Sequence, residues 1–138
     1  MKPVLLDTNV IVAAFDKRQR DHKRCRQTLE ALEQAVVTCE AVITESCYLL
    51  SPIFGASEAL LANVEEGLFE IRFHLPAAIV EICALMRKYR DLPISFADAC
   101  LIQMADELDT GDILTLDSDF LHYRWRKTRH FNLLIPLG

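Results

Sequence analysis

The stretch VLLDTNVIVAAF, residues 4–15, places the carboxylate of Asp7 directly after three aliphatic residues. Residues 4–6 are short, aliphatic and partly β-branched, which predicts a buried strand, while residues 10–15 either continue that strand or begin a helix. Asp, Thr and Asn are also the residue types that cap a helix N-terminus after a tight turn. Asp7 is therefore either a helix cap or a functional acid, and the rest of the chain has to decide.

Length and composition favour one compact domain. The chain has 138 residues, of which 51% are hydrophobic and 25% charged, and this excludes a disordered or fibrous protein. We expect a single domain over residues 1–138. Asp7 and Glu81 interrupt the apolar stretches that could form a signal peptide or a membrane span, so we expect a soluble cytoplasmic protein with no membrane partner. The five cysteines form no C-x-x-C pair, which suggests neither disulfides nor zinc.

Short apolar runs alternate with helical periodicity along the chain. The predicted strands are residues 4–6, 36–38, 68–75, 113–116 and 133–135. The predicted helices are residues 25–35, 41–50, 57–66, 76–89 and 95–108. Strands that are separated by helices pair in parallel, with helices on both faces of the sheet. The sequence therefore predicts an α/β protein, a three-layer α/β/α sandwich with a central, mainly parallel sheet.

Acidic residues follow two of the predicted strands. Asp7 ends the first, and Asp117 ends the run ILTLD, with Asp119 two residues later. Ligands bind outside the carboxyl ends of the strands in open α/β sheets, so we expect these acids to share one edge. The alternative is that DSD, residues 117–119, forms only a capping turn.

Two further acids, Glu45 and Asp98, lie within predicted helices. Their neighbours at helical spacing are mostly apolar, so we expect each carboxylate to interrupt a core-facing stripe. Burial of an unpaired carboxylate costs several kcal/mol unless a cation, a set of donors or a ligand compensates. Two simpler interpretations stay open: Ser95 and Asp98 match a capping box, and Glu45 could pair with an arginine.

Four motifs in this order resemble the PIN-domain nucleases and, among these, the toxins of VapBC-type toxin–antitoxin pairs. They are LLDTNV at 5–10, ITES at 43–46, ISFADACLIQMA at 94–105 and ILTLDSDF at 113–120. The resemblance implies that the catalytic, metal-binding acids are Asp7, Glu45, Asp98 and Asp117. It also implies that Asp119 is an additional acid of the metal site and that the supporting polar residues are Thr8, Asn9 and Thr115.

Such an acid set suits the cleavage of phosphodiester bonds. Oxygen ligands select Mg²⁺ or Mn²⁺, and one or two such ions activate a water and stabilise charge on the leaving oxygen. We expect Asp7 and Asp98 to bind metal directly, and Glu45 and Asp117 to do so directly or through water. The resulting prediction is a metal-dependent endoribonuclease that hydrolyses RNA and is silenced by a cognate antitoxin.

Other classes remain as alternatives. One is a PIN-fold RNA-processing nuclease without an antitoxin, and another is a non-catalytic binding module whose acids anchor a partner's arginines. A receiver or a haloacid-dehalogenase-like phosphatase fits less well, because the phosphatase motif has a second Asp where this chain has Asn9.

Positive charge gathers in two stretches, residues 17–26 and 124–129, although the formal net charge is −5. We expect these stretches to contact RNA phosphates and the interleaved Tyr123 and Trp125 to stack on unpaired bases. Either stretch could instead be a solvated charged face. The RNA-binding candidates are Arg18, Arg20, Lys23, Arg24, Arg124 and Arg126.

The segments AVITESCYLL, residues 41–50, and SPIFGASEALL, residues 51–61, offer more hydrophobic surface than one small core needs. Together with the resemblance, this predicts a homodimer. We expect the antitoxin to insert an apolar helix and a basic side chain near the acidic pocket.

Overall fold

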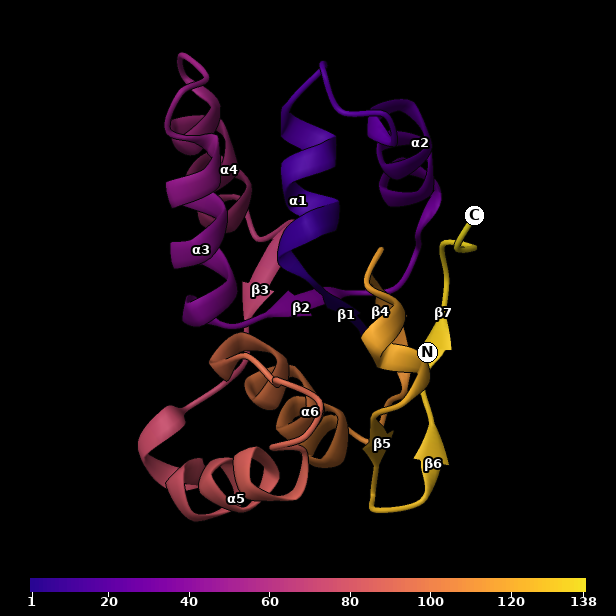
Figure 1. Cartoon of the computed structure of the whole chain (residues 1–138). Helices are drawn as coiled ribbons and strands as arrows, with labels where there is room; N and C mark the ends of the chain where they lie inside the picture. The colour runs from indigo at the N-terminus through magenta and orange to yellow at the C-terminus, as the bar shows by residue number, and fades with distance from the viewer.

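A five-stranded sheet lies between two layers of helices in the computed structural model, which describes residues 1–138 (Figure 1). The helices are α1 (Thr8–Phe15), α2 (His22–Ala31), α3 (Glu40–Leu50), α4 (Ala56–Glu65), α5 (Leu75–Lys88), α6 (Phe96–Leu108) and the short 3-10 helix η1 (Ser118–Leu121). The strands are β1 (Val4–Leu6), β2 (Val36–Thr38), β3 (Phe69–Ile71), β4 (Asp112–Leu114), β5 (Arg124–Trp125), β6 (Arg129–His130) and β7 (Asn132–Leu133). The predicted α/β/α fold is confirmed.

The strands of the main sheet are all parallel and run in the order β3-β2-β1-β4-β7. β1 is central, and its Leu5 lies beside both Val37 of β2 and Ile113 of β4. The chain moves outward from β1 to β2 and β3 and then returns to place β4 on the other side. The strand order therefore reverses between β1 and β4, and the carboxyl ends of strands at such a switch point commonly form a ligand site.

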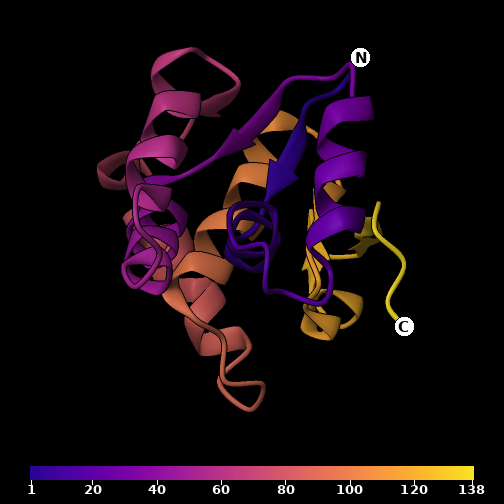
Figure 2. The same ribbon diagram turned by 90° about the horizontal axis from the view of Figure 1, so that it is seen from above.

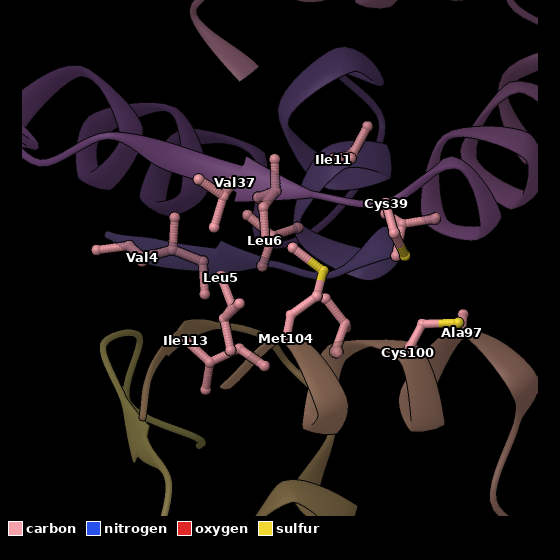
Figure 3. Packing of buried hydrophobic residues seen from close by; sticks show 14 of the residues in the cluster. Val4, Leu5, Leu6, Ile11, Val37, Cys39, Ala97, Cys100, Met104 and Ile113 are labelled. Atoms are coloured by element: carbon pink, nitrogen blue, oxygen red, sulfur yellow. The ribbon is translucent and has the colours of Figure 1, made fainter. Parts of the chain in front are cut away.

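Helices cover both faces of the sheet. α1 to α4 lie on one face and α5 and α6 on the other (Figure 1), and α1 lies between α2 and the α3–α4 pair (Figure 2). Figure 3 shows Ile11 of α1 on one side of β1 and Met104 of α6 pointing at the other. Both are fully buried within a cluster of 33 hydrophobic residues. Because β1 is covered on both faces, its residues form a continuous apolar run instead of an alternating one.

Several predicted boundaries are wrong. The helix expected over 25–35 is α2, at 22–31, because Leu32 is already extended where the chain turns toward β2. The strand expected over 68–75 has only three residues, and α5 begins at Leu75. The last strand is 132–133 in place of 133–135.

The antiparallel hairpin β5–β6 was not predicted from the sequence. Its turn places Arg126 and Lys127 in the left-handed region, with φ of 44° and 69°. Hairpin turns of this kind are ordinarily signalled by Gly, Asn or Asp, and neither residue belongs to that set. No helix in the fold combines the length and apolar content that a bilayer crossing requires.

Candidate metal centre

Three carboxylates meet at the switch point between β1 and β4. Asp7 follows β1, Asp117 follows β4 after two residues, and Asp98 lies in the first turn of α6. Each offers one oxygen, and these oxygens all lie within 4.8 Å of one another. Asp7 and Asp98 are buried and Asp117 is half-buried. The structure thus brings together three of the five acids that were predicted to form the metal site.

Asp7 caps α1 and belongs to the acidic cluster at the same time. Its Oδ1 accepts a hydrogen bond from the backbone N–H of Thr8 at 2.7 Å. Its Oδ2 accepts from the hydroxyl of Thr115 at 2.7 Å and from the amide of Asn9 at 3.4 Å. The capping and functional interpretations are therefore compatible at this residue.

The supporting polar residues tie the ends of β1 and β4 together. The Thr115 hydroxyl also accepts from the backbone N–H of Asp117 at 3.0 Å. The Asn9 side-chain oxygen accepts from the backbone N–H of Leu116 at 2.9 Å. Asp117 itself caps η1, since its Oδ1 accepts from the backbone N–H of Asp119 at 2.8 Å. The DSD sequence is thus a capping turn, and that turn holds an acid of the cluster.

Hydrogen bonds with Ser95 and Tyr123 fix Asp98 in place. Its backbone N–H donates to the hydroxyl of Ser95 at 3.0 Å, as a capping box requires. Its Oδ2 accepts from the phenolic hydroxyl of Tyr123 at 3.2 Å. Burial, reinforced by the charge of Asp98, raises the pKa of Tyr123 above its usual range, so its hydroxyl stays protonated and acts as a donor.

The cluster is short of positive charge. Burial, together with the charge of Asp98, raises the pKa of Asp7 to about 7, although the hydrogen bond from Thr115 lowers it. Burial and then the charge of Asp117 raise the pKa of Asp98. None of the three acids forms an ion pair with a Lys, Arg or His side chain. The Thr8 hydroxyl beside them is buried without a hydrogen-bond partner.

This chemistry fits a hard divalent cation. All three charged donors are carboxylate oxygens, which suit Mg²⁺ or Mn²⁺ better than a soft metal. A bound cation would supply the missing counter-charge and lower the cost of burying these acids.

Glu45 and Asp119 lie on the rim of the same pocket, which has a volume of about 480 Å³. Glu45 is exposed, so the prediction that it interrupts a core-facing stripe is wrong. α3 packs through its other face, and the helical neighbours Tyr48 and Leu49 are 77% and 49% exposed. Glu45 pairs with no arginine either. Asp119 is half-buried, and neither residue belongs to the group of three converging acids.

In the first basic stretch, several side chains bind groups of the protein itself. Arg18 donates to both carboxylate oxygens of Asp16. Arg20 and Arg24 donate to the backbone carbonyls of Gly138 and Pro136. Lys23 is exposed.

The second basic stretch surrounds buried aromatic rings. Arg124 donates to the backbone carbonyl of Leu121, and Arg126 pairs with Asp109 at 2.7 Å. Tyr123 and Trp125 are 0% and 6% exposed, so the prediction that they stack on RNA bases is wrong. The Trp125 indole packs so closely over the backbone of Gly111 that any side chain there would collide with it.

The contact between Tyr123 and Asp98 was missed by the sequence analysis. The two residues are 25 positions apart, and no local motif links them. The only signal in the sequence was an aromatic residue next to a basic stretch. That context favoured a role for Tyr123 at the surface.

Comparison with known proteins places these features in a family context. The model of the PIN domain family matches residues 4–126, a range that contains all five predicted acids. Ribonuclease VapC26 of Mycobacterium tuberculosis (strain ATCC 25618 / H37Rv) is 31% identical over 137 residues, which cover 98% of this chain and 94% of the relative.

Proposed function

Because this chain belongs to the PIN-domain family, we propose that it is a metal-dependent endoribonuclease and the toxin of a toxin–antitoxin pair. The observation that carries the proposal is the convergence of three carboxylate oxygens within 4.8 Å at the strand switch point, without a compensating positive side chain. The similarity to a ribonuclease over nearly the whole chain supports RNA as the substrate.

We propose Mg²⁺ or Mn²⁺ as the ion, held by Asp7, Asp98 and Asp117. When bound, the ion supplies Lewis-acid chemistry, which activates a water and stabilises charge on the phosphate during hydrolysis. Thr115 and Asn9 orient Asp7 through the hydrogen bonds to its Oδ2. These fixed donors hold the carboxylate in place before substrate arrives, so less reorganisation is needed during the reaction.

Glu45 and Asp119 act from the rim in this proposal. Both line the pocket with the three converging acids, and each can contact the ion through water or orient the water that attacks. The side chain of Glu45 has no fixed partner and is exposed, so it can adjust when an RNA strand enters. Its role therefore differs from the structural anchoring of Asp7.

For RNA contact we retain the six basic candidates, Arg18, Arg20, Lys23, Arg24, Arg124 and Arg126. Support is strongest for Arg18 and Arg20, whose side chains are 74% and 79% exposed. They flank Gln19, which lines the acidic pocket. Phosphates on either side of the scissile bond could reach these guanidinium groups, which would offset the repulsion between RNA and the acids.

The proposed protein partners are a cognate antitoxin and a second copy of the chain. An apolar groove of about 720 Å³ shares Glu45 and Ser95 with the acidic pocket and exposes Tyr48 and Phe96. That continuity suits an antitoxin helix that ends in a basic side chain directed at the acids. The further exposed hydrophobic residues, Phe54 and Val80 among them, favour a homodimer. We place the protein in the cytoplasm, where its five free thiols stay reduced.

The deciding experiment is cleavage of single-stranded and looped RNA by the purified protein. We expect cleavage with Mg²⁺ or Mn²⁺ and none in EDTA, with activity restored when excess metal is added back. Binding of RNA without metal-dependent cleavage would instead support the non-catalytic binding module. Concentration-dependent sedimentation tests the dimer separately, since a strict monomer would contradict that part alone.

A further inference from the structure

Tyr123 reaches the acidic cluster but has no role in the proposed function so far. It lies between η1 and β5, and its hydroxyl donates to Oδ2 of Asp98 at 3.2 Å. The residue is completely buried, so this hydroxyl cannot exchange its partner for bulk water. A tyrosine in such a position is either a core residue that has found an acceptor or a residue that orients the acid.

The surroundings of Tyr123 fix its ring independently of Asp98. The ring packs edge-on against Tyr89 at 5.1 Å and against Phe120 at 5.0 Å between centroids. Phe120 in turn packs edge-on against Phe131 at 5.3 Å. The position of the Tyr123 hydroxyl is therefore set by packing, and the carboxylate has to orient toward it.

We infer that Tyr123 is a positioning residue of the metal centre, which holds one oxygen of Asp98 so that the other is directed at the shared cation. This inference rests on the proposed function, because it assigns the cation to Asp7, Asp98 and Asp117. Fixed donors also bind the other two acids: Thr115 donates to Asp7, and the backbone of Asp119 donates to Asp117. Asp98 is the acid whose orienting side chain is aromatic and is itself fixed by ring packing.

Groups that orient metal ligands affect metal binding measurably. Loss of such a partner typically weakens metal affinity or activity by about 10–100-fold. A residue that only fills the core would affect folding stability and leave the affinity of the folded protein for metal unchanged. The two roles therefore separate when metal binding and stability are measured on the same variants.

The test compares Tyr123→Phe with Tyr89→Phe. Both substitutions remove one hydroxyl from the same aromatic cluster, but the Tyr89 hydroxyl bonds a backbone N–H and touches no acid. Mn²⁺ alone is titrated into each purified, metal-stripped protein by calorimetry, and thermal melts in EDTA check that each is folded. We expect the dissociation constant for Mn²⁺ to rise about tenfold in Tyr123→Phe and to stay within twofold of wild type in Tyr89→Phe.

A second measurement uses cleavage at increasing Mn²⁺. We expect Tyr123→Phe to need about tenfold more metal for half-maximal rate and to recover most of its rate at saturation, with the KM for RNA unchanged. An unchanged Mn²⁺ dissociation constant in a folded Tyr123→Phe protein, beside a wild type that binds the ion, would overturn this inference alone. A wild-type protein that does not bind Mn²⁺ would overturn the proposed function as well.

Discussion

The two walls of the acidic pocket differ in how firmly the protein holds them. The firm wall, at the ends of β1 and β4 and the start of α6, carries Asp7, Asp98 and Asp117. Each of these acids accepts a hydrogen bond from a fixed donor. The adjustable wall, on α3 and in the segment after α1, carries the exposed residues Glu45 and Gln19. A preorganised wall suits a small cation whose ligands must be placed accurately, whereas an adjustable wall suits a flexible polymer. Substitutions on the two walls should therefore have different effects.

The largest expected effect comes from Asp7→Ala on the firm wall. Removal of this carboxylate takes away a proposed metal ligand and the acceptor for Thr115, so we expect RNA cleavage to fall at least about a thousandfold, or about 4 kcal/mol. The matched control is Asp112→Asn, a carboxylate at the opposite end of β4 that binds Asn132. Cleavage rates and circular dichroism of both variants provide the test. Full activity in folded Asp7→Ala would show that the site is misplaced.

The next effect is a dependence of stability on pH in metal-free protein. Because burial raises the pKa of Asp7 from an ordinary 3.8 to about 7, the folded state keeps a proton that the unfolded state releases across this range. The contribution of Asp7 to the free energy of unfolding should be fully present below about pH 4 and be lost as the pH rises to 7, by an amount on the order of 4 kcal/mol at most. Saturating Mg²⁺ favours the charged carboxylate and should flatten the slope.

Urea unfolding between pH 4.5 and 7.5, in EDTA and in Mg²⁺, measures this dependence. Asp7→Asn serves as the reference, because it cannot titrate and should lack the Asp7 contribution in EDTA. If the free energy of unfolding depends on pH equally in wild type and Asp7→Asn in EDTA, the carboxyl of Asp7 is not held protonated by its surroundings.

Asp98→Asn should separate metal binding from helix capping. The substitution removes one of three converging charges but keeps the size of the side chain and the backbone bond to Ser95. We expect the metal-free melting temperature to rise by about 4 °C, or about 1 kcal/mol, while cleavage and the stabilisation by Mg²⁺ are lost. Thermal melts with and without Mg²⁺ measure both the melting temperature and the stabilisation by the ion, and an RNA cleavage assay measures the activity. A variant that Mg²⁺ stabilises as well as wild type would make Asp98 a capping residue only.

The smallest effect belongs to Glu45→Gln on the adjustable wall. Since Glu45 is exposed and outside the group of three, we expect a loss of cleavage of about tenfold, or about 1.4 kcal/mol. The melting temperature in EDTA should stay within about 1 °C of wild type, because no buried contact is lost. A loss of cleavage as large as that of Asp7→Ala would mean that Glu45 contributes as much to the site as the acids of the firm wall.

The firm wall was largely predictable from the sequence and the adjustable wall was not. Asp7 and Asp117 each follow a short apolar run, and parallel topology alone places the ends of two neighbouring strands together. Asp98 was identified because its neighbours at helical spacing are mostly apolar, and the structure buries its helix nearly all round. Glu45 was placed wrongly because α3 is apolar on two faces, and periodicity does not tell which face meets the core. The contact of Tyr123 depends on a hairpin whose turn lacks the usual residues, so no local signal could indicate it.

The bond between Asp7 and Thr115 joins residues 108 positions apart, and this separation has a consequence for synthesis. A nascent chain makes β1 first, but β1 lacks its neighbour β4 and the Asp117 carboxylate until most of the protein has been translated. A chain that ends between residues 99 and 111 therefore contains Asp7, Glu45 and Asp98 but lacks β4, Thr115 and Asp117. Only a chain translated through β4 and Asp117 can therefore bring the three carboxylates of the acidic cluster together.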